Sequence, residues 1–180
     1  MPTRRLFIGC FIDAAGFSER YQTIKNDFRS AVSGKWTPLE NLHFTIKFLG
    51  DTEEGLIPEI KTAISACAPE KMPADIKLGG LCYFTRENPR ILYLKADDAA
   101  GVLKKVFSDL ETGLELLGFA REKRGFAPHI TLMRIKSSVI ELFNKAVSRH
   151  ENFDAGRMAE VEISLIESVL EKSGAVYKKI

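Results

Sequence analysis

The sequence predicts an α+β fold of two lobes, each a β-α-β-α-β unit with an antiparallel-type sheet, that face a central cleft. Three observations support this prediction. Short apolar strands alternate with amphipathic helices, no linker rich in Pro, Gly or Ser divides the chain, and the same order of elements occurs twice, about 85 residues apart. We therefore expect one domain over residues 1–180, made of two pseudo-twofold-related lobes with interwoven repeats at roughly 1–84 and 85–180.

The first strand and the first helix of each repeat are indicated by their hydrophobic periods. Apolar runs over Arg5–Asp13 and Arg90–Asp97 are typical of buried strands. Apolar residues spaced by three or four then predict helices over Ala14–Val32 and Ala99–Leu117. Each repeat thus opens with a strand followed by a helix.

The other elements of each repeat are a strand, a helix and a strand. They are expected at Leu42–Leu49, Leu56–Cys67 and Asp75–Leu81 in the first repeat, and at His129–Ile135, Val139–His150 and Glu160–Ile166 in the second. Tight turns are predicted at Gly50-Asp51 and around Gly79-Gly80.

The composition excludes several classes of protein. Hydrophobic residues make up 45% of the chain, charged residues 28%, and the formal net charge is +2, which excludes disordered and collagen-like chains and makes a monomer the default expectation. The longest uncharged apolar run, Leu6–Ile12, is far shorter than the roughly 20 residues that span a bilayer, so we expect no membrane association. Three cysteines in apolar contexts without metal-ligand spacing predict reduced thiols and a cytoplasmic protein.

Two of the three histidines occupy the same position in the two repeats, and a threonine follows each of them two residues later. Residues i and i+2 of a strand share a face, so His43 and Thr45 point the same way, as do His129 and Thr131. The repeat symmetry would bring both pairs into one cleft. A lone histidine in an apolar strand is usually structural, but two matched His-x-Thr pairs favour a functional site.

Paired imidazoles suit in-line displacement at a phosphodiester. An unperturbed histidine has a pKa near 6.5, so one imidazole can take a proton from water while the other gives one to the departing ribose oxygen. Threonine hydroxyls can donate hydrogen bonds to the phosphoryl oxygens. Lys47 has the parity of His43 and is expected on the phosphate side, whereas Arg134 needs a bulge or a bend to bind the phosphate. The pattern does not choose which histidine is the acid.

Other chemistries have little support in the sequence. Two histidines without an H-x-x-x-H motif or clustered carboxylates are too few for a closed zinc site, so no metal or other cofactor is expected. The glycine patterns of nucleotide-binding loops and the nucleophile elbow of acyl-transfer enzymes are missing. His150 ends a predicted helix and has no counterpart in the first repeat, so we expect it to be solvated.

Five segments spread over the whole chain carry a family resemblance. They are Arg5–Ile8 (RLFI), Trp36–Gly50 (WTPLENLHFTIKFLG), Arg90–Leu94 (RILYL), Gly125–Arg134 (GFAPHITLMR) and the closing Ser168 with Gly174–Tyr177 (GAVY). Their tandem H-x-T-x motifs resemble those of the two-histidine (2H) phosphoesterases. Within that superfamily the sequence is most similar to the RNA 2′,3′-cyclic phosphodiesterase branch, formerly called 2′-5′ RNA ligase.

The resemblance implies a bilobal fold with the active site in the groove between the lobes. It implies metal-free hydrolysis of a terminal 2′,3′-cyclic phosphate of RNA to a 2′-phosphomonoester, together with an ability to join or reverse 2′-5′ linkages. By position in the motifs, His43 would be the proton donor to the leaving 3′ oxygen and His129 the proton acceptor that activates water. Thr45 and Thr131 would bind the phosphate.

One departure from the family pattern concerns the residues before the second motif. Arg124-Gly-Phe-Ala-Pro-His has glycine where the family often shows a first proline, so Arg124 would be held less rigidly as a phosphate or ribose contact. Phe84 and Phe126 are the candidates for stacking on a terminal base.

Two other functions stay open. One is a phosphodiesterase acting on 2′-5′-linked oligonucleotides or on ADP-ribose cyclic phosphate. The other, of a different class, is a non-catalytic module that binds a nucleotide or RNA. Both His-x-Thr pairs are intact, which favours catalysis over binding alone because binding does not require a matched acid and base.

Overall fold

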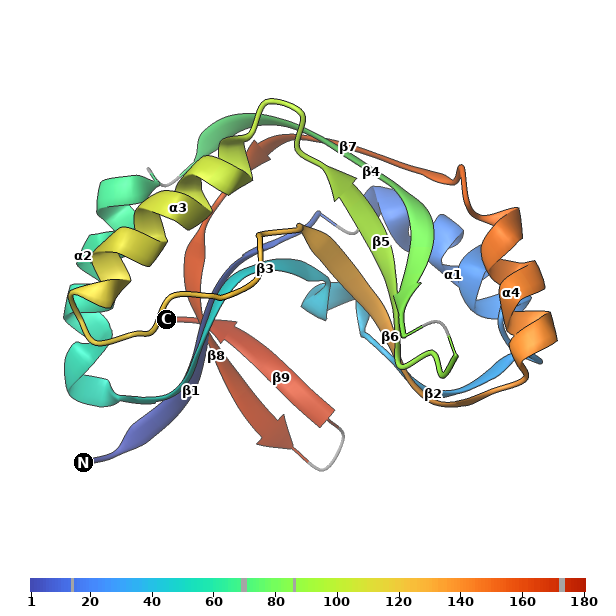
Figure 1. Ribbon diagram of the computed structural model, residues 1–180, viewed down its shortest axis with the longest axis horizontal. Helices are drawn as coiled ribbons and strands as arrows, with labels where there is room; N and C mark the ends of the chain where they lie inside the picture. The colour runs from blue at the N-terminus through green and yellow to red at the C-terminus, as the bar shows by residue number, and fades with distance from the viewer. Residues whose placement is uncertain (14, 69–70, 86, 172–173) are drawn as a thin grey trace.

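The computed structural model describes residues 1–13, 15–68, 71–85, 87–171 and 174–180. Its described strands belong to one antiparallel sheet, which bends into an arch with two helices on the outside of each half (Figure 1). The predicted α+β class is confirmed. None of the helices among these residues has the length and apolar character needed to cross a membrane.

The strands follow one another in the sheet in the order β7-β4-β5-β6-β3-β1-β8-β9, and β2 pairs with the far part of β6. The strands are β1 (Thr3–Phe11), β2 (Val32–Trp36), β3 (His43–Glu53), β4 (Met72–Phe84), β5 (Ile91–Asp97), β6 (His129–Ser138), β7 (Asp154–Val161), β8 (Ser164–Glu171) and β9 (Gly174–Lys179). The helices are α1 (Ser18–Asp27), α2 (Ile57–Cys67), α3 (Val102–Glu115) and α4 (Ile140–Arg149), with short 3-10 turns η1 (Ala15–Phe17), η2 (Leu39–Asn41) and η3 (Glu54–Leu56).

The two halves of the sheet are joined where β3 meets β6. These strands pair at one position, Phe44 with Ile130, and both side chains are fully buried. Helices α2 and α3 pack together against the half that contains β3 and β8. On the other half, the Tyr21 hydroxyl of α1 donates to the Leu132 carbonyl of β6, and Phe143 of α4 packs on Tyr83 of β4. Each half therefore takes one helix from each sequence repeat.

Most of the predicted elements are present with their ends shifted by up to four residues, and two differ more from the structure. The helix expected over Ala14–Val32 ends at Asp27, and Val32 already belongs to β2; Ala14 lies outside the described residues. The strand expected over Glu160–Ile166 is instead the end of β7 and the start of β8. The chain passes there from one half of the sheet to the other, and buried Val161 and Ile163 keep the run apolar through the break.

The glycines expected in turns lie inside long strands. Gly50 in β3 and Gly80 in β4 stand at register shifts with φ angles of 74° and 67°, which glycine adopts without a steric penalty. A Cβ on Gly80 would also come within 2.8 Å of the Glu151 carbonyl oxygen. Glycine at these positions therefore bends a strand that continues instead of ending it.

His150 is buried, and the expectation that it is solvated is wrong. Its Nε2 lies 2.7 Å from Oδ2 of Asp27 at the end of α1, and its ring packs on Phe28 and Phe153. The side chain is 6% exposed. His150 therefore ties the end of α4 to the end of α1, a contact between the repeats that the local sequence pattern does not contain.

We expect His150→Ala to lower the free energy of unfolding by about 2 kcal/mol, because it removes a buried ring and leaves Asp27 without this partner. Urea denaturation followed by circular dichroism measures the change. Arg149→Ala, one residue earlier and exposed, is the matched control and should change the value by less than about 0.5 kcal/mol. Equal effects of the two substitutions would contradict the structural role of His150.

Candidate active site

The four motif residues meet at the crossing of β3 and β6. The strands begin with His43 and His129 and pair antiparallel through the residue that follows each histidine. Continuing this register by one residue in each direction sets His43 opposite Thr131 and Thr45 opposite His129. All four side chains are half-buried and point away from the helix-covered face. The structure thus brings the two imidazoles and the two hydroxyls together on one face of the sheet.

Both imidazoles are held by the same local contact. Nδ1 of His43 lies 2.6 Å from the Asn41 carbonyl oxygen, and Nδ1 of His129 lies 3.0 Å from the Ala127 carbonyl oxygen. A carbonyl only accepts hydrogen bonds, so each Nδ1 carries the hydrogen. Nε2 of each ring is then the atom that accepts a proton when the ring is neutral and donates one when it is charged.

Arg134 and Lys47 each lie on the face of the sheet opposite to the one that simple alternation predicts. Each motif strand carries an extra residue directly after its threonine, Ile46 in β3 and Leu132 in β6, where the register shifts. A bulge reverses the parity of the residues that come after it. The bulge that Arg134 requires is therefore present, and its charge acts on His43.

Lys47 does not lie on the phosphate side, and that expectation is wrong. The bulge turns its side chain to the helix-covered face, where it is 3% exposed. Its Nζ forms an ion pair with Glu111 of α3 and donates to the Ala120 carbonyl at 2.8 Å. Alternation in the sequence does not reveal a bulge, so the parity rule holds as far as Thr45 and fails immediately after it.

His43 is surrounded by aromatic rings from distant parts of the chain. The ring centroids of Phe7 and Tyr177 lie 4.9 Å from that of His43, and the centroid of Phe11 lies at 6.1 Å. The Asn41 side chain donates to the Ala175 carbonyl at 3.0 Å and so holds β9, which carries Tyr177, against this wall. Tyr177 belongs to the closing segment of the resemblance, but only the fold places it beside a histidine.

This environment lowers the pKa of His43. Burial is the main cause, and the nearby charges of His129 and Arg134 act in the same direction, while the hydrogen bond to Asn41 opposes them. The unliganded site therefore favours a neutral imidazole at this position. A bound phosphate, which is anionic, would favour the charged form.

The candidate base contacts have different surroundings. Phe84 is 41% exposed, stacks on Tyr93 at 4.5 Å and has its ring centroid 5.2 Å from that of His129, so it stands at the site. Phe126 stacks instead on Phe107 of α3 at 4.9 Å, which turns its ring toward the helix. Arg124 lies in the exposed segment before β6. Tyr93 belongs to the RILYL segment of the resemblance, but the sequence does not mark it as a site residue; its position follows from its pairing with Thr131.

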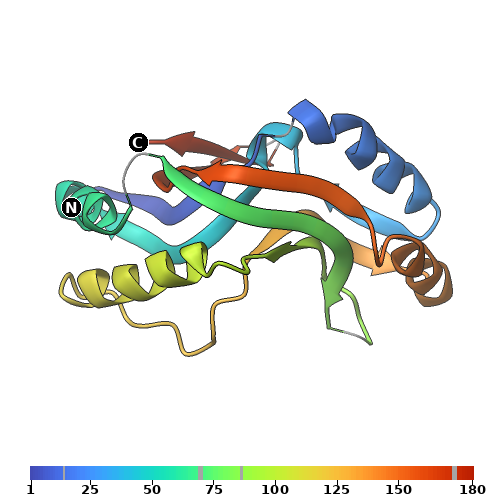
Figure 2. The same cartoon turned by 90° about the horizontal axis from the view of Figure 1, so that it is seen from above.

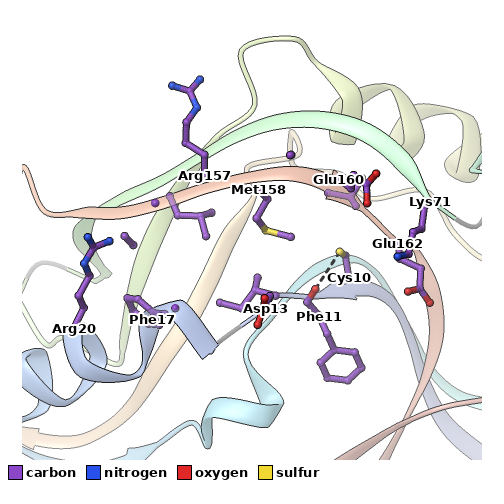
Figure 3. A pocket seen from close by; sticks show the side chains of 17 residues that line it. Cys10, Phe11, Asp13, Phe17, Arg20, Lys71, Arg157, Met158, Glu160 and Glu162 are labelled. Carbon is purple, nitrogen blue, oxygen red and sulfur yellow. Dashed lines mark hydrogen bonds between the residues drawn. The ribbon is translucent and has the colours of Figure 1, made fainter.

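A separate cavity of about 550 Å³ lies between the end of β1, α1 and β7 (Figure 3). Arg20 and Lys71 stand at its two ends, and neither histidine lines it. The buried Cys10 thiol at its edge donates to the Phe11 carbonyl at 3.4 Å, and burial raises the thiol pKa, so the group stays protonated and unreactive. This cavity is therefore separate from the face that carries the two motif histidines.

Two imidazoles with Nε2 available, two hydroxyls and a guanidinium on one face define an acid–base site for a phosphodiester. The residues described in the structure include no group of three or more His, Cys, Asp or Glu placed to hold a metal ion. Independence from metals and other cofactors stays a prediction.

The chain belongs to the family described as LigT like Phosphoesterase, whose profile matches residues 12–93 and 94–177. It is 27% identical over 179 residues to the RNA 2′,3′-cyclic phosphodiesterase of Aquifex aeolicus, covering 98% of this chain and 95% of the relative. It is 30% identical over 179 residues to the protein of that name from Methanothermobacter thermautotrophicus, covering 96% and 94%. The predicted family is confirmed.

Solved structures share the fold. The crystal structure of TT0787 of Thermus thermophilus superposes with a TM-score of 0.77 at 29% identity, covering 98% of this chain and 94% of that one. Escherichia coli LigT complexed with 3′-AMP gives a TM-score of 0.74 at 20% identity, covering 99% and 95%. The bilobal arrangement is therefore that of a known fold.

We expect the imidazole of His43 to titrate below pH 6.5 in the free protein and at a higher pH in saturating inorganic phosphate. NMR of histidine-labelled protein measures both titrations. Because the folded pKa is below that of the unfolded chain, the folded state binds fewer protons between the two values, and stability rises with pH through that window. A free-state pKa at or above 6.5 would contradict the effect of burial.

Proposed function

We propose that this protein hydrolyses the terminal 2′,3′-cyclic phosphate of RNA to a 2′-phosphomonoester. The observation that carries the proposal is the matched pair of histidines, each with Nδ1 held by a backbone carbonyl and each facing the threonine of the other motif. The relatives named RNA 2′,3′-cyclic phosphodiesterase support a substrate with this end, and the 3′-AMP complex of Escherichia coli LigT supports binding of a nucleotide.

The reaction begins with water and ends with a free 3′ hydroxyl. Nε2 of neutral His129 accepts a proton from water as the water oxygen attacks the phosphorus. The bond from phosphorus to the 3′ oxygen breaks, and Nε2 of charged His43 gives its proton to that oxygen. The 2′ ester remains, and exchange of protons with solvent restores both imidazoles.

The surrounding groups support these roles. Thr45, Thr131 and Arg134 would donate hydrogen bonds to the phosphoryl oxygens as negative charge develops on them. The rings around His43 offer an apolar wall for the ribose and base, which would set the leaving 3′ oxygen next to this histidine. The anionic substrate would raise the pKa of His43 on binding and so charge the acid only when there is phosphate to cleave.

We also propose that the enzyme works in the cytoplasm. Cys10, Cys67 and Cys82 are all free thiols, and a chain with three unpaired cysteines suits a reducing compartment. The monomeric state and the ability to reverse the reaction with an RNA hydroxyl in place of water stay predictions.

The test is hydrolysis of a short RNA ending in a 2′,3′-cyclic phosphate, in EDTA, with the 2′- and 3′-phosphate products separated by chromatography. We expect the 2′ product alone and a bell-shaped dependence of kcat/KM on pH, since the active state needs one neutral and one charged histidine. A 3′ product or inhibition by EDTA would contradict the mechanism.

Binding without turnover would favour the module that only binds RNA. Turnover of 2′-5′-linked oligonucleotides or ADP-ribose cyclic phosphate in place of this RNA would favour the other phosphodiesterase function.

We expect His43→Ala and His129→Ala each to lower kcat/KM by at least about 100-fold with circular dichroism unchanged. Arg149→Ala, which is exposed at the end of α4, is the control and should keep the full rate. A normal rate in either histidine variant would remove that histidine from the reaction.

A further inference from the structure

The buried ion pair of Lys47 and Glu111 lies on the face of the sheet opposite to the two motif histidines. Both residues are almost inaccessible, at 3% and 5% exposed. Burying two charges is costly, and a well-packed apolar pair of similar volume is often as stable or more stable. The second repeat shows that an apolar side chain fits at the position of Lys47, because Met133 follows His129 as Lys47 follows His43 and is also buried. Packing alone therefore does not explain the ion pair.

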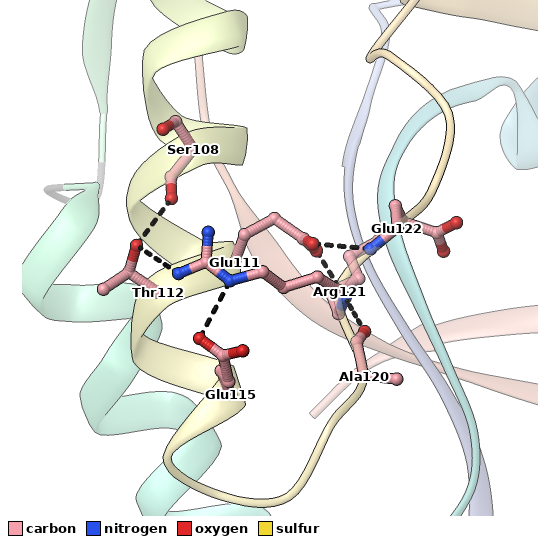
Figure 4. A network of polar contacts seen from close by, with 8 residues as sticks. Ser108, Glu111, Thr112, Glu115, Ala120, Arg121 and Glu122 are labelled. Carbon is pink, nitrogen blue, oxygen red and sulfur yellow. Dashed lines mark hydrogen bonds and ion pairs between the residues drawn. The ribbon is translucent and has the colours of Figure 1, made fainter.

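The remaining hydrogen bonds of the pair go to one backbone segment. Lys47 Nζ donates to the Ala120 carbonyl at 2.8 Å, and Oε2 of Glu111 accepts the Glu122 N–H at 2.6 Å. Figure 4 shows the Glu111 side chain extending from α3 to this segment. The ion pair thus holds one carbonyl and one N–H, two residues apart, in the stretch that comes after α3.

That stretch, residues 119–128, leads directly into the second motif. It has no helix or strand, and it runs outside the sheet before it enters β6 (Figure 2). Residues 120–125 are all exposed, so the segment buries little of its own surface there. At its end, the Ala127 carbonyl accepts from Nδ1 of His129 and the Pro128 carbonyl accepts from Ala96 N–H. The carbonyl at the end of this segment therefore helps to orient the His129 ring.

We propose that the ion pair of Lys47 and Glu111 is a clamp that positions residues 119–128, and through them the His129 imidazole and Arg124, for reaction. Lys47 follows the first histidine on the same strand, so the clamp connects the first motif to the second through the core. Both are positioning residues, since neither lies on the histidine face. The inference rests on the proposed two-histidine reaction for its kinetic consequence, but its structural consequence is independent of that reaction.

The kinetic test removes the charges and keeps the packing. The double variant Lys47→Met/Glu111→Leu should fold, because Met133 occupies the matching position of the second repeat and an apolar pair can replace a buried ion pair without loss of stability. We expect kcat to fall by about 10- to 100-fold, since small displacements of a catalytic group have effects of that size. Arg121→Met, which removes the exposed ion pair with Glu115 from the same segment, is the control and should keep the wild-type kcat. A folded double variant with wild-type kcat would overturn the proposal.

The structural test uses the wild-type protein and needs no turnover. The Glu122 amide, which donates to buried Glu111, should exchange its hydrogen on the order of 100-fold more slowly than the exposed amide of Lys123. NMR should also find the neutral His129 ring as the Nδ1–H tautomer in wild type and as a mixture of tautomers in the double variant. Equal exchange at Glu122 and Lys123 would overturn the clamp. Inactivity of wild-type protein with slow exchange at Glu122 would instead count against the proposed function.

Discussion

The site depends on one antiparallel contact, the pairing of Phe44 with Ile130 that joins the two halves of the sheet. It sets the two His-x-Thr pairs opposite each other, while pairing of β3 with β1 and of β6 with β5 continues the sheet on either side. Because side chains alternate along a strand, a slip of one residue would turn the histidines into the core and the apolar residues into the cleft. Complete burial of the two paired side chains opposes that slip, so the hydrophobic core fixes the geometry of the polar face.

The sequence was sufficient to predict the two His-x-Thr pairs because repetition and alternation can both be read directly from the order of residues. The matched positions of His43 and His129, and their shared parity with the threonines, survive in the structure. The orientation of the residues after the threonines was not predictable. An inserted residue leaves no mark in the pattern of apolar residues, yet it decides that Arg134 stands near His43 and that Lys47 enters the core. Parity arguments in strands therefore hold only up to the first bulge.

The other features that the sequence analysis did not predict also involve contacts between distant residues. The position of His150 at the end of a predicted helix indicates a solvated side chain, but in the fold the ring contacts Asp27. The strand that carries Tyr177 has a short, mixed sequence, and the Asn41 side chain helps to hold it beside the histidine. The partners of these residues depend on how the helices and the last hairpin pack across the two halves of the sheet.

A duplicated motif supplies two chemically identical imidazoles, whereas acid–base catalysis needs them in different protonation states at the same moment. Around the motifs the repeats depart from symmetry. Arg134 in the second repeat corresponds to Phe48 in the first, and Phe48 is 66% exposed. Lys47 in the first repeat corresponds to Met133 in the second. The first difference gives His43 a nearby positive charge, that of Arg134. The second gives β3 a buried ion pair, that of Lys47 with Glu111, at a position where β6 has an apolar residue. The duplication thus accounts for the presence of two histidines, and the unmatched residues next to them give the two imidazoles different surroundings.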